Sequence, residues 1–232
     1  MTLATEITGA IGLLSIPGLS GWLLAPEGAA VHLAEETAVI ADVHLGYEWA
    51  RATGGDVIPP HSLSETMWKL TSLLGRTPIA RVIIAGDLVE SSKPCLRTSR
   101  DVACLLGWLA ERGVEFIWLQ GNHDPANGQA SSIVVDGWTI VHGDRPLGNG
   151  KRIFGHHHPA LKSAGLSAPS FLIGAETIAL PAFSPNAAGL DVATGQLPKP
   201  LRREPLRCIA GMGDELLDFG PLDELAAKLR RM

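Results

Sequence analysis

Side chains that bind metal ions recur directly after short apolar runs of this 232-residue chain. Five such runs each lead into a block of histidine, aspartate or asparagine, and glycines at 86, 121, 143 and 155 suit sharp turns close to these side chains. Mixed nitrogen and oxygen ligands suit Mn²⁺, Fe or Zn²⁺ better than Ca²⁺, which prefers oxygen alone. The blocks supply seven candidate ligands: Asp42, His44, Asp87, Asn122, His142, His156 and His158.

This number of ligands favours two ions over one. A tetrahedral zinc ion takes about four ligands, whereas two ions that share one carboxylate would use seven. Ions about 3.5–4 Å apart can hold the attacking and leaving oxygens of an in-line displacement at phosphorus, and a water that bridges them can act as the nucleophile. The residues therefore predict a hydrolase with two divalent metal ions, for which Mn²⁺ is the first choice and Fe or Zn²⁺ are alternatives.

The elements that must position these side chains are predicted to alternate between strand and helix in the first half of the chain. Helical spacing of apolar residues predicts helices over 62–75 and over about 102–113, and Ser62 with Glu65 forms a capping-box pattern. Short apolar runs predict buried strands at Thr37–Ala41, Arg81–Ala85 and Phe116–Leu119.

The second half is predicted to be mostly β-structure. Asp136-Gly137 between two apolar runs predicts a hairpin, and short strands are expected at 152–154, 170–173 and 177–180. This order favours a parallel core that is extended by antiparallel strands and covered by helices. Ligand sites in open α/β sheets lie at the carboxyl ends of strands, so we expect the seven candidate ligands to meet at one edge.

One domain over residues 1–196 and a tail over 197–232 are the predicted organisation. The tail is rich in proline and charge, and residues 222–231 have the pattern of a short amphipathic helix. We expect the metal site not to depend on this tail.

Composition narrows the function classes. A net charge of −5 argues against a strongly basic, non-specific nucleic-acid binder. Three cysteines without metal-ligand spacing indicate reduced thiols and a cytoplasmic location. The uncharged stretch between Glu6 and Glu27 contains glycines and prolines that would break a membrane helix, so short strands with turns and no membrane association are predicted.

The blocks, in this order, resemble those of the calcineurin-like metallophosphoesterases. They are Asp-x-His at 42–44, Gly-Asp at 86–87, Gly-Asn-His-Asp at 121–124, His-Gly at 142–143 and Gly-His-x-His-Pro at 155–159. More narrowly, residues 41–46 followed by Arg51, together with 173–183, resemble the small bacterial DNA-ligase-associated phosphoesterases. Those are relatives of archaeal proteins similar to double-strand-break repair nuclease subunits.

This resemblance implies an α/β fold, a four-layer αββα sandwich of mixed sheets known as the metallo-dependent phosphatase fold. It also implies two divalent metal ions. The ligand set that it implies is Asp42, His44 and His158 for the first ion, Asn122, His142 and His156 for the second, and Asp87 as the bridge between them.

Other roles also follow from the resemblance. His123 would assist the leaving-group oxygen, Asp124 would orient the His123 imidazole, and Arg51 would contact substrate phosphate. The role of Glu90, three residues after Asp87, is open. We expect His157 to be a spacer that faces solvent.

The implied activity is hydrolysis of a phosphodiester, in a nucleotide or a nucleic-acid end, by a metal-bridging hydroxide. A phosphomonoesterase or a nucleotide pyrophosphohydrolase could use the same site. A metal-binding scaffold for a DNA-repair partner, such as a ligase or helicase, is a further alternative, although His123 and Asp124 argue against it because scaffolding needs neither. The oligomeric state is not predicted.

Overall fold

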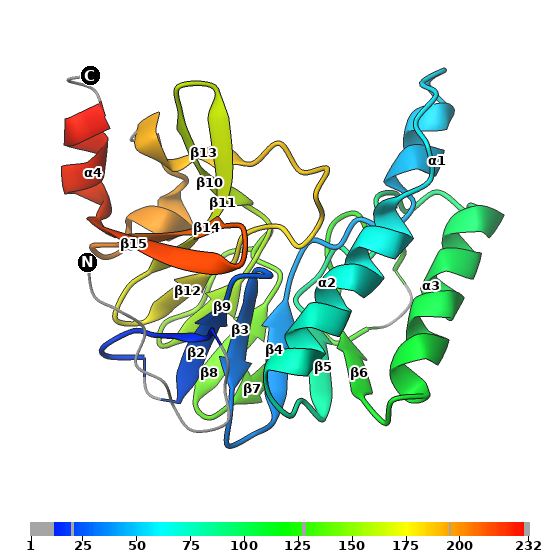
Figure 1. Ribbon diagram of the computed structural model, residues 1–232, viewed down its shortest axis with the longest axis horizontal. Helices are drawn as coiled ribbons and strands as arrows, with labels where there is room; N and C mark the ends of the chain where they lie inside the picture. Colours follow the sequence, from blue (N-terminus) through cyan, green and yellow to red (C-terminus); the bar gives the residue numbers. More distant parts are fainter. Residues whose placement is uncertain (1–11, 20, 127–128, 195, 230–232) are drawn as a thin grey trace.

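A computed structural model describes residues 12–19, 21–126, 129–194 and 196–229. Two β-sheets lie face to face, and the first has the strand order β1-β2-β3-β4-β5-β6 (Figure 1). Its members are β1 (Leu14–Ser15), β2 (Trp22–Ala25), β3 (Ala29–His32), β4 (Thr37–Ile40), β5 (Arg81–Ile84) and β6 (Glu115–Trp118). Strands β4, β5 and β6 are parallel and the earlier ones antiparallel, which confirms the predicted parallel core with its antiparallel extension.

The second sheet has the order β13-β10-β11-β12-β9-β8-β7, and β14 pairs with β11 and β15. The hairpin at Asp136-Gly137 is confirmed, with φ angles of 44° and 73° that suit its tight turn. The strands are β7 (Ser132–Val135), β8 (Trp138–Val141), β9 (Arg152–Phe154), β10 (Pro159–Ser163), β11 (Leu166–Ile173), β12 (Thr177–Ala179), β13 (Leu190–Asp191), β14 (Arg207–Met212) and β15 (Glu215–Pro221).

Alternation along the strands creates separate apolar layers. In β5, Ile83 packs between the two sheets, whereas Val82 and Ile84 pack under the helices of the first sheet. The outer layers consist of α2 (Ser62–Arg76) and α3 (Leu96–Ala110) on the first sheet, and of η1 (Val192–Thr194), η2 (Lys199–Arg202) and α4 (Leu222–Leu229) on the second. The predicted four-layer sandwich is confirmed, and its fourth layer consists of short helices.

The start of α2 differs from the predicted capping box. Ser62 is the first helical residue, and its hydroxyl accepts a hydrogen bond from the Gly46 N–H at 3.2 Å. The carboxylate of Glu48, in the short helix α1 (Tyr47–Ala52), accepts hydrogen bonds from the N–H groups of His61 and Ser62 at 3.0 and 3.3 Å. A carboxylate from a neighbouring element therefore caps this helix, so a local sequence pattern could not identify it.

The segment after residue 196 packs on the second sheet. Strand β14 pairs with β11 over four residues, and Cys208, Leu222 and Leu225 are buried in the outer apolar layer. The division into a domain and a tail stays a prediction.

Each helix in the part of the chain that the structure describes is too short or too polar to cross a membrane. The cytoplasmic location stays a prediction. Of the uncharged stretch near the N-terminus, residues 7–11 and 20 lie outside the described residues, and β1 and β2 lie in the remainder.

Candidate metal centre

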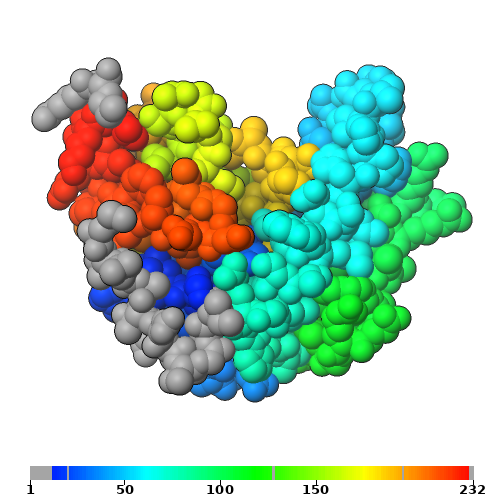
Figure 2. Space-filling view, viewed as in Figure 1, coloured from blue at the N-terminus to red at the C-terminus, as the bar shows by residue number. Residues whose placement is uncertain are grey.

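The five sequence blocks meet at one edge of the sandwich. Strands β4 and β5 are parallel neighbours, and so are β8 and β9, so the residues that follow them leave the sheets on the same side. Figure 2 shows a hollow on this side between α1 and the hairpin of β10 and β11. Topology thus brings together residues that are more than a hundred positions apart.

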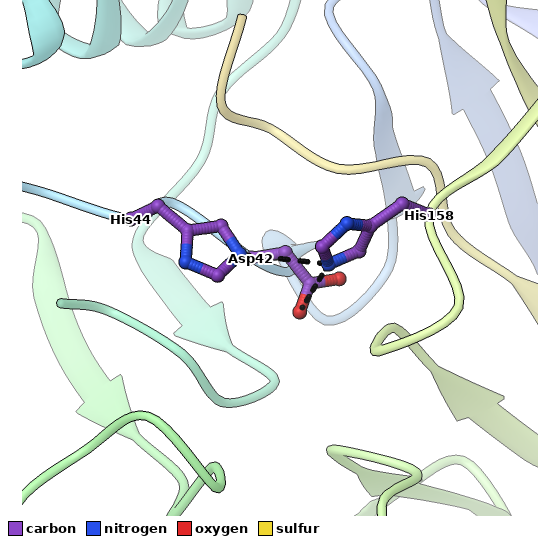
Figure 3. A group of neighbouring side chains, drawn as sticks. All are labelled: Asp42, His44 and His158. Carbon is purple, nitrogen blue, oxygen red and sulfur yellow. Dashed lines mark hydrogen bonds and ion pairs between the residues drawn. The ribbon is translucent and has the colours of Figure 1, made fainter. Parts of the chain in front are cut away.

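Three of the candidate ligands form a first group, shown in Figure 3. Asp42, His44 and His158 each offer a ligand atom within 4.8 Å of the other two. The Nε2 atom of His158 lies 3.4 Å from Asp42 Oδ1 and 3.5 Å from His44 Nε2. The three side chains therefore converge on one point from two segments that are far apart in the sequence, the one after β4 and the one after β9.

Asp87, His142 and His156 form a second group with the same spacing. His142 donates its Nδ1–H to the carbonyl of Ala85 at 3.0 Å, which leaves Nε2 as the ligand nitrogen. This Nε2 lies 3.3 Å from Asp87 Oδ2, 3.2 Å from His156 Nδ1 and 2.9 Å from the amide oxygen of Asn122. All seven predicted ligands are thus brought into two groups.

Asp42 connects the two groups. Its Oδ1 lies 3.6 Å from His142 Nδ1, and its Oδ2 accepts a hydrogen bond from the His156 N–H at 2.8 Å. The groups are therefore adjacent, as a site for two ions requires. The role of Asp87 as the bridging carboxylate stays a prediction.

Two observations show that this place suits cations. The buried Oδ1 of Asp42 accepts no hydrogen bond within the described ranges, which is costly unless a positive charge compensates it. Backbone strain also concentrates here, at about 1–3 kcal/mol per residue. Five of the eight described non-glycine residues with positive φ are candidate ligands, namely Asp42 (57°), His44 (51°), Asp87 (50°), His156 (67°) and His158 (44°).

The charges of the two carboxylates act on the neighbouring imidazole. Burial disfavours the charged forms of both Asp87 and His142. The contact between the two side chains outweighs this effect of burial, so the pKa of the Asp87 carboxyl lies below its ordinary value. Contact with Asp87 and the charge of Asp42 raise the pKa of His142 to about 9. The carboxylates thus favour a positive charge at this place, which a divalent ion would supply.

Two of the predicted glycines allow the close packing of the site. Gly86 has a φ of +83°, and a Cβ atom there would overlap the His142 ring. A Cβ atom at Gly155 would overlap the carboxylate of Asp42. Both positions therefore need glycine for space, and Gly86 also needs it for its backbone angle.

His123 lies beside both groups, but Asp124 does not orient it. The His123 ring donates its Nδ1–H to the carbonyl of Glu90 at 2.7 Å, and its backbone N–H donates to Asp87 Oδ1 at 2.8 Å. The structure gives Asp124 a different role, because its buried carboxylate fixes the loops around Asp87. It accepts hydrogen bonds from the N–H groups of Asp87, Val89 and Gly121 and from the indole of Trp118.

Two further expectations differ from the structure. Arg51 lies on α1, is exposed and pairs with Asp56 at 2.6 Å, so it is not brought to the candidate ligands. His157 does not face solvent: it is half-buried with its ring centroid 6.1 Å from that of Phe154. Burial lowers the pKa of His157 to about 4.

Sequence reasoning missed the segment over 184–188, which lines a cavity of about 210 Å³ beside the candidate ligands. This segment carries no metal-binding motif. Its backbone runs next to the first group because the Ser184 N–H donates to the Asp42 carbonyl at 3.0 Å. Tyr47 and Glu90 line the same cavity together with His44 and His123.

Comparisons with known proteins agree with this geometry. The model of the family described as calcineurin-like phosphoesterase matches residues 36–170, more than half of the chain. A search of curated proteins gives no match.

Among solved structures, the nuclease MPE of Pseudomonas putida matches with a TM-score of 0.65 and 21% identity, over 84% of this chain and 94% of that chain. Similarity at this level of identity shows a shared fold. A single mutant of Vps29 from Entamoeba histolytica aligns at 15% identity over 79% of this chain and 99% of that chain, but its TM-score of 0.33 supports no conclusion. The family match, the shared fold and the two groups of candidate ligands together show that this chain belongs to the calcineurin-like phosphoesterases and is a metal-dependent phosphoester hydrolase.

Proposed function

We propose that this enzyme is a phosphodiesterase that acts on nucleotides or nucleic-acid ends with two divalent metal ions, preferably Mn²⁺. The observation that carries the proposal is the shape and charge of the groove beside the candidate ligands. The cavity of about 210 Å³ shares His158, Ser184 and residues 186–188 with a second cavity of about 320 Å³. The second cavity continues over Pro159, Ala160 and Pro169.

This groove suits a diester better than a monoester. A diester carries one negative charge and extends on both sides of its phosphorus, whereas a terminal phosphate is a dianion that proteins commonly hold with arginine or lysine. Neither cavity contains a lysine or arginine among its described lining residues. Two adjoining cavities past the candidate ligands, neither lined by a lysine or arginine among the described residues, therefore favour an extended substrate.

In this proposal the two groups hold one ion each, with Asn122 in the second group and Asp87 shared between them. Two bound ions would lower the pKa of a water molecule and stabilise charge on the phosphoryl oxygens. The protein orients the imidazoles: the Ala85 carbonyl fixes His142, and the Glu90 carbonyl leaves Nε2 of His123 as the nitrogen that serves the leaving group.

The choice of nucleic acid as substrate has two further supports. The structurally similar Pseudomonas putida protein is named a nuclease. The blocks at 41–46 and 173–183 resemble those of DNA-ligase-associated phosphoesterases. A role in DNA repair beside a ligase or helicase is part of this proposal.

Hydrolysis of bis(p-nitrophenyl) phosphate and of p-nitrophenyl phosphate, each with Mn²⁺ and with a chelator, tests the function. We expect Mn²⁺-dependent turnover of the diester with a higher kcat/KM than that of the monoester. Faster hydrolysis of the monoester would contradict the proposal and favour a phosphomonoesterase. Turnover of neither ester by a protein that holds two ions would favour a pyrophosphohydrolase or a scaffold.

A further inference from the structure

Glu90 is held in a fixed position next to the first group of candidate ligands. The segment after β5 continues beside the segment after β4, because the His44 N–H donates to the Asp87 carbonyl at 3.0 Å and the Leu45 N–H to the Leu88 carbonyl at 2.8 Å. The Glu90 N–H then donates to the Leu45 carbonyl at 3.0 Å. These hydrogen bonds extend the parallel pairing beyond the strands, so the backbone determines where Glu90 lies relative to His44.

The carboxylate of Glu90 contacts the nitrogen of His44 that faces away from the other ligands. Glu90 Oε2 lies 3.0 Å from His44 Nδ1, and the two side chains are 23% and 7% exposed. The contact is an ion pair without hydrogen-bond geometry, and this buried Nδ1 forms no hydrogen bond within the described residues. The opposite ring nitrogen, Nε2, lies 3.5 Å from His158 Nε2. A carboxylate on one side of a ligand imidazole fixes its tautomer and its orientation.

The main chain of Glu90 holds a second imidazole. Its carbonyl accepts the Nδ1–H of His123 at 2.7 Å, and the rings of His44 and His123 are nearly perpendicular, with centroids 5.2 Å apart. In the His123 ring Nδ1 therefore carries the proton. A proton on Nδ1 of His44 would likewise face the Glu90 carboxylate, which would leave Nε2 of both rings for a ligand or a substrate.

We propose that Glu90 is a positioning residue that orients His44 through its carboxylate and His123 through its carbonyl. This inference rests on the proposed function, because it assumes that His44 holds a metal ion. The ligand atoms of His44, Glu90 and His123 lie within 4.8 Å of one another, so direct ligation by Glu90 is the competing interpretation. The contact with Nδ1 places the Glu90 carboxylate on the far side of the His44 ring from His158, which favours positioning over ligation.

Calorimetric titration of the full-length, chelator-treated protein with Mn²⁺ tests this role. The variants are Glu90→Ala and Glu90→Gln. Glu115→Gln is the matched control, because this exposed residue is the first of β6 and so lies at the end of the strands away from the candidate ligands. Thermal unfolding of each chelator-treated variant shows whether it is folded.

We expect two equivalents of Mn²⁺ in the parent and about a 10–100-fold loss of affinity at one of them in Glu90→Ala. Glu90→Gln should stay within about three-fold of the parent, because its amide oxygen can accept a hydrogen bond from the same Nδ1 atom. Nitrogen-15 NMR of the Zn²⁺-loaded protein should show a proton on Nδ1 of both His44 and His123.

Three results would overturn the inference. Unchanged affinity in Glu90→Ala would remove the positioning role. An equal loss of Mn²⁺ affinity in Glu90→Ala and Glu90→Gln, with only one equivalent of Mn²⁺ bound, would show that Glu90 is a metal ligand. A proton on Nε2 of His123, with none on Nδ1, would remove the role of the carbonyl. A parent that binds no Mn²⁺ would instead overturn the proposed function together with this inference.

Discussion

His123 is the residue whose chemistry can be separated from metal binding. Its ring nitrogen Nδ1 is engaged by a main-chain carbonyl, and it belongs to neither of the two groups proposed to hold the ions. His123→Ala should therefore keep two equivalents of Mn²⁺ and lose about 10²–10⁴-fold in kcat for the diester. Metal content and kcat measured on the same preparation check this prediction. Parental activity with full metal content would show that His123 is not catalytic.

Asp87 should behave in the opposite way, because metal binding and activity both depend on it. The Asp87→Asn variant loses the charge that two ions would share, in a side chain that is only 2% exposed. We expect the loss of at least one equivalent of Mn²⁺ together with diester hydrolysis. Metal analysis after dialysis measures the bound Mn²⁺, and the diester assay measures the hydrolysis. Full activity in this variant would exclude a site with two ions bridged by Asp87.

For individual residues, spacing in the sequence predicted the candidate ligands but not the residues that orient these ligands. Asp42, Asp87 and His142 each follow a predicted strand, and the rule that ligand sites lie at the carboxyl ends of strands predicted that they meet. The partners of Glu90 and Asp124 are N–H groups, a carbonyl and an imidazole from other loops, which no local pattern encodes. The positive φ angles of the ligands are likewise a property of the folded chain.

Helix α2 is connected to the groove by a half-buried lysine. The Nζ atom of Lys69 donates a hydrogen bond to the Phe183 carbonyl at 2.7 Å and lies 4.1 Å from the centre of the Phe183 ring. Phe183 immediately precedes Ser184, which lines the groove. Burial lowers the pKa of Lys69 to about 8, although the charge of Glu27 opposes this shift. The helix and the segment 184–188 are therefore held together by a titratable contact.

This contact predicts a pH dependence of stability. The folded chain releases the Lys69 proton at about pH 8 and the unfolded chain only near pH 10.5, so the unfolded state binds more protons between these values and stability rises with pH. From about pH 7.5 to 9.5 the parent should gain about 2 kcal/mol relative to Lys69→Met. Urea unfolding at both values measures this gain, and Lys93→Met, at an exposed position, is the control. Equal pH dependence in parent and Lys69→Met would contradict the account.

Helices and strands were predictable where the pattern of their own residues indicates the secondary structure. The strand beginning at Thr37, the helix beginning at Ser62 and the hairpin at Asp136-Gly137 were predicted from periodicity and turn chemistry. Strands β10, β13, β14 and β15 were not predicted, although β10 with β11 and β14 with β15 form hairpins between neighbouring strands. The capping of α2 by Glu48 was missed because the carboxylate belongs to another element, α1.

The whole molecule depends on its C-terminal segment for one outer layer. The sequence favours a metal site that is independent of residues 197–232, but Leu201, Ile209, Leu222 and Leu225 are buried against the second sheet. Burial of each contributes about 1.5–3 kcal/mol, so their loss removes about 6–12 kcal/mol, which is comparable to the total stability of a typical domain.

A chain that ends at residue 196 should therefore be unfolded or expanded, and should bind Mn²⁺ poorly. Circular dichroism and Mn²⁺ titration of this truncation, beside the full chain, check the prediction. A cooperative unfolding transition with two equivalents of bound Mn²⁺ would instead support a separable tail.

The most direct test of the central claim is a Mn²⁺ titration of the chelator-treated enzyme in which bound metal and diester hydrolysis are followed together. The account predicts that activity appears in full only with the second equivalent of Mn²⁺ and that the bound ions raise the temperature of unfolding. Full activity with one equivalent, or diester hydrolysis that persists in excess chelator, would contradict a catalytic site of two metal ions.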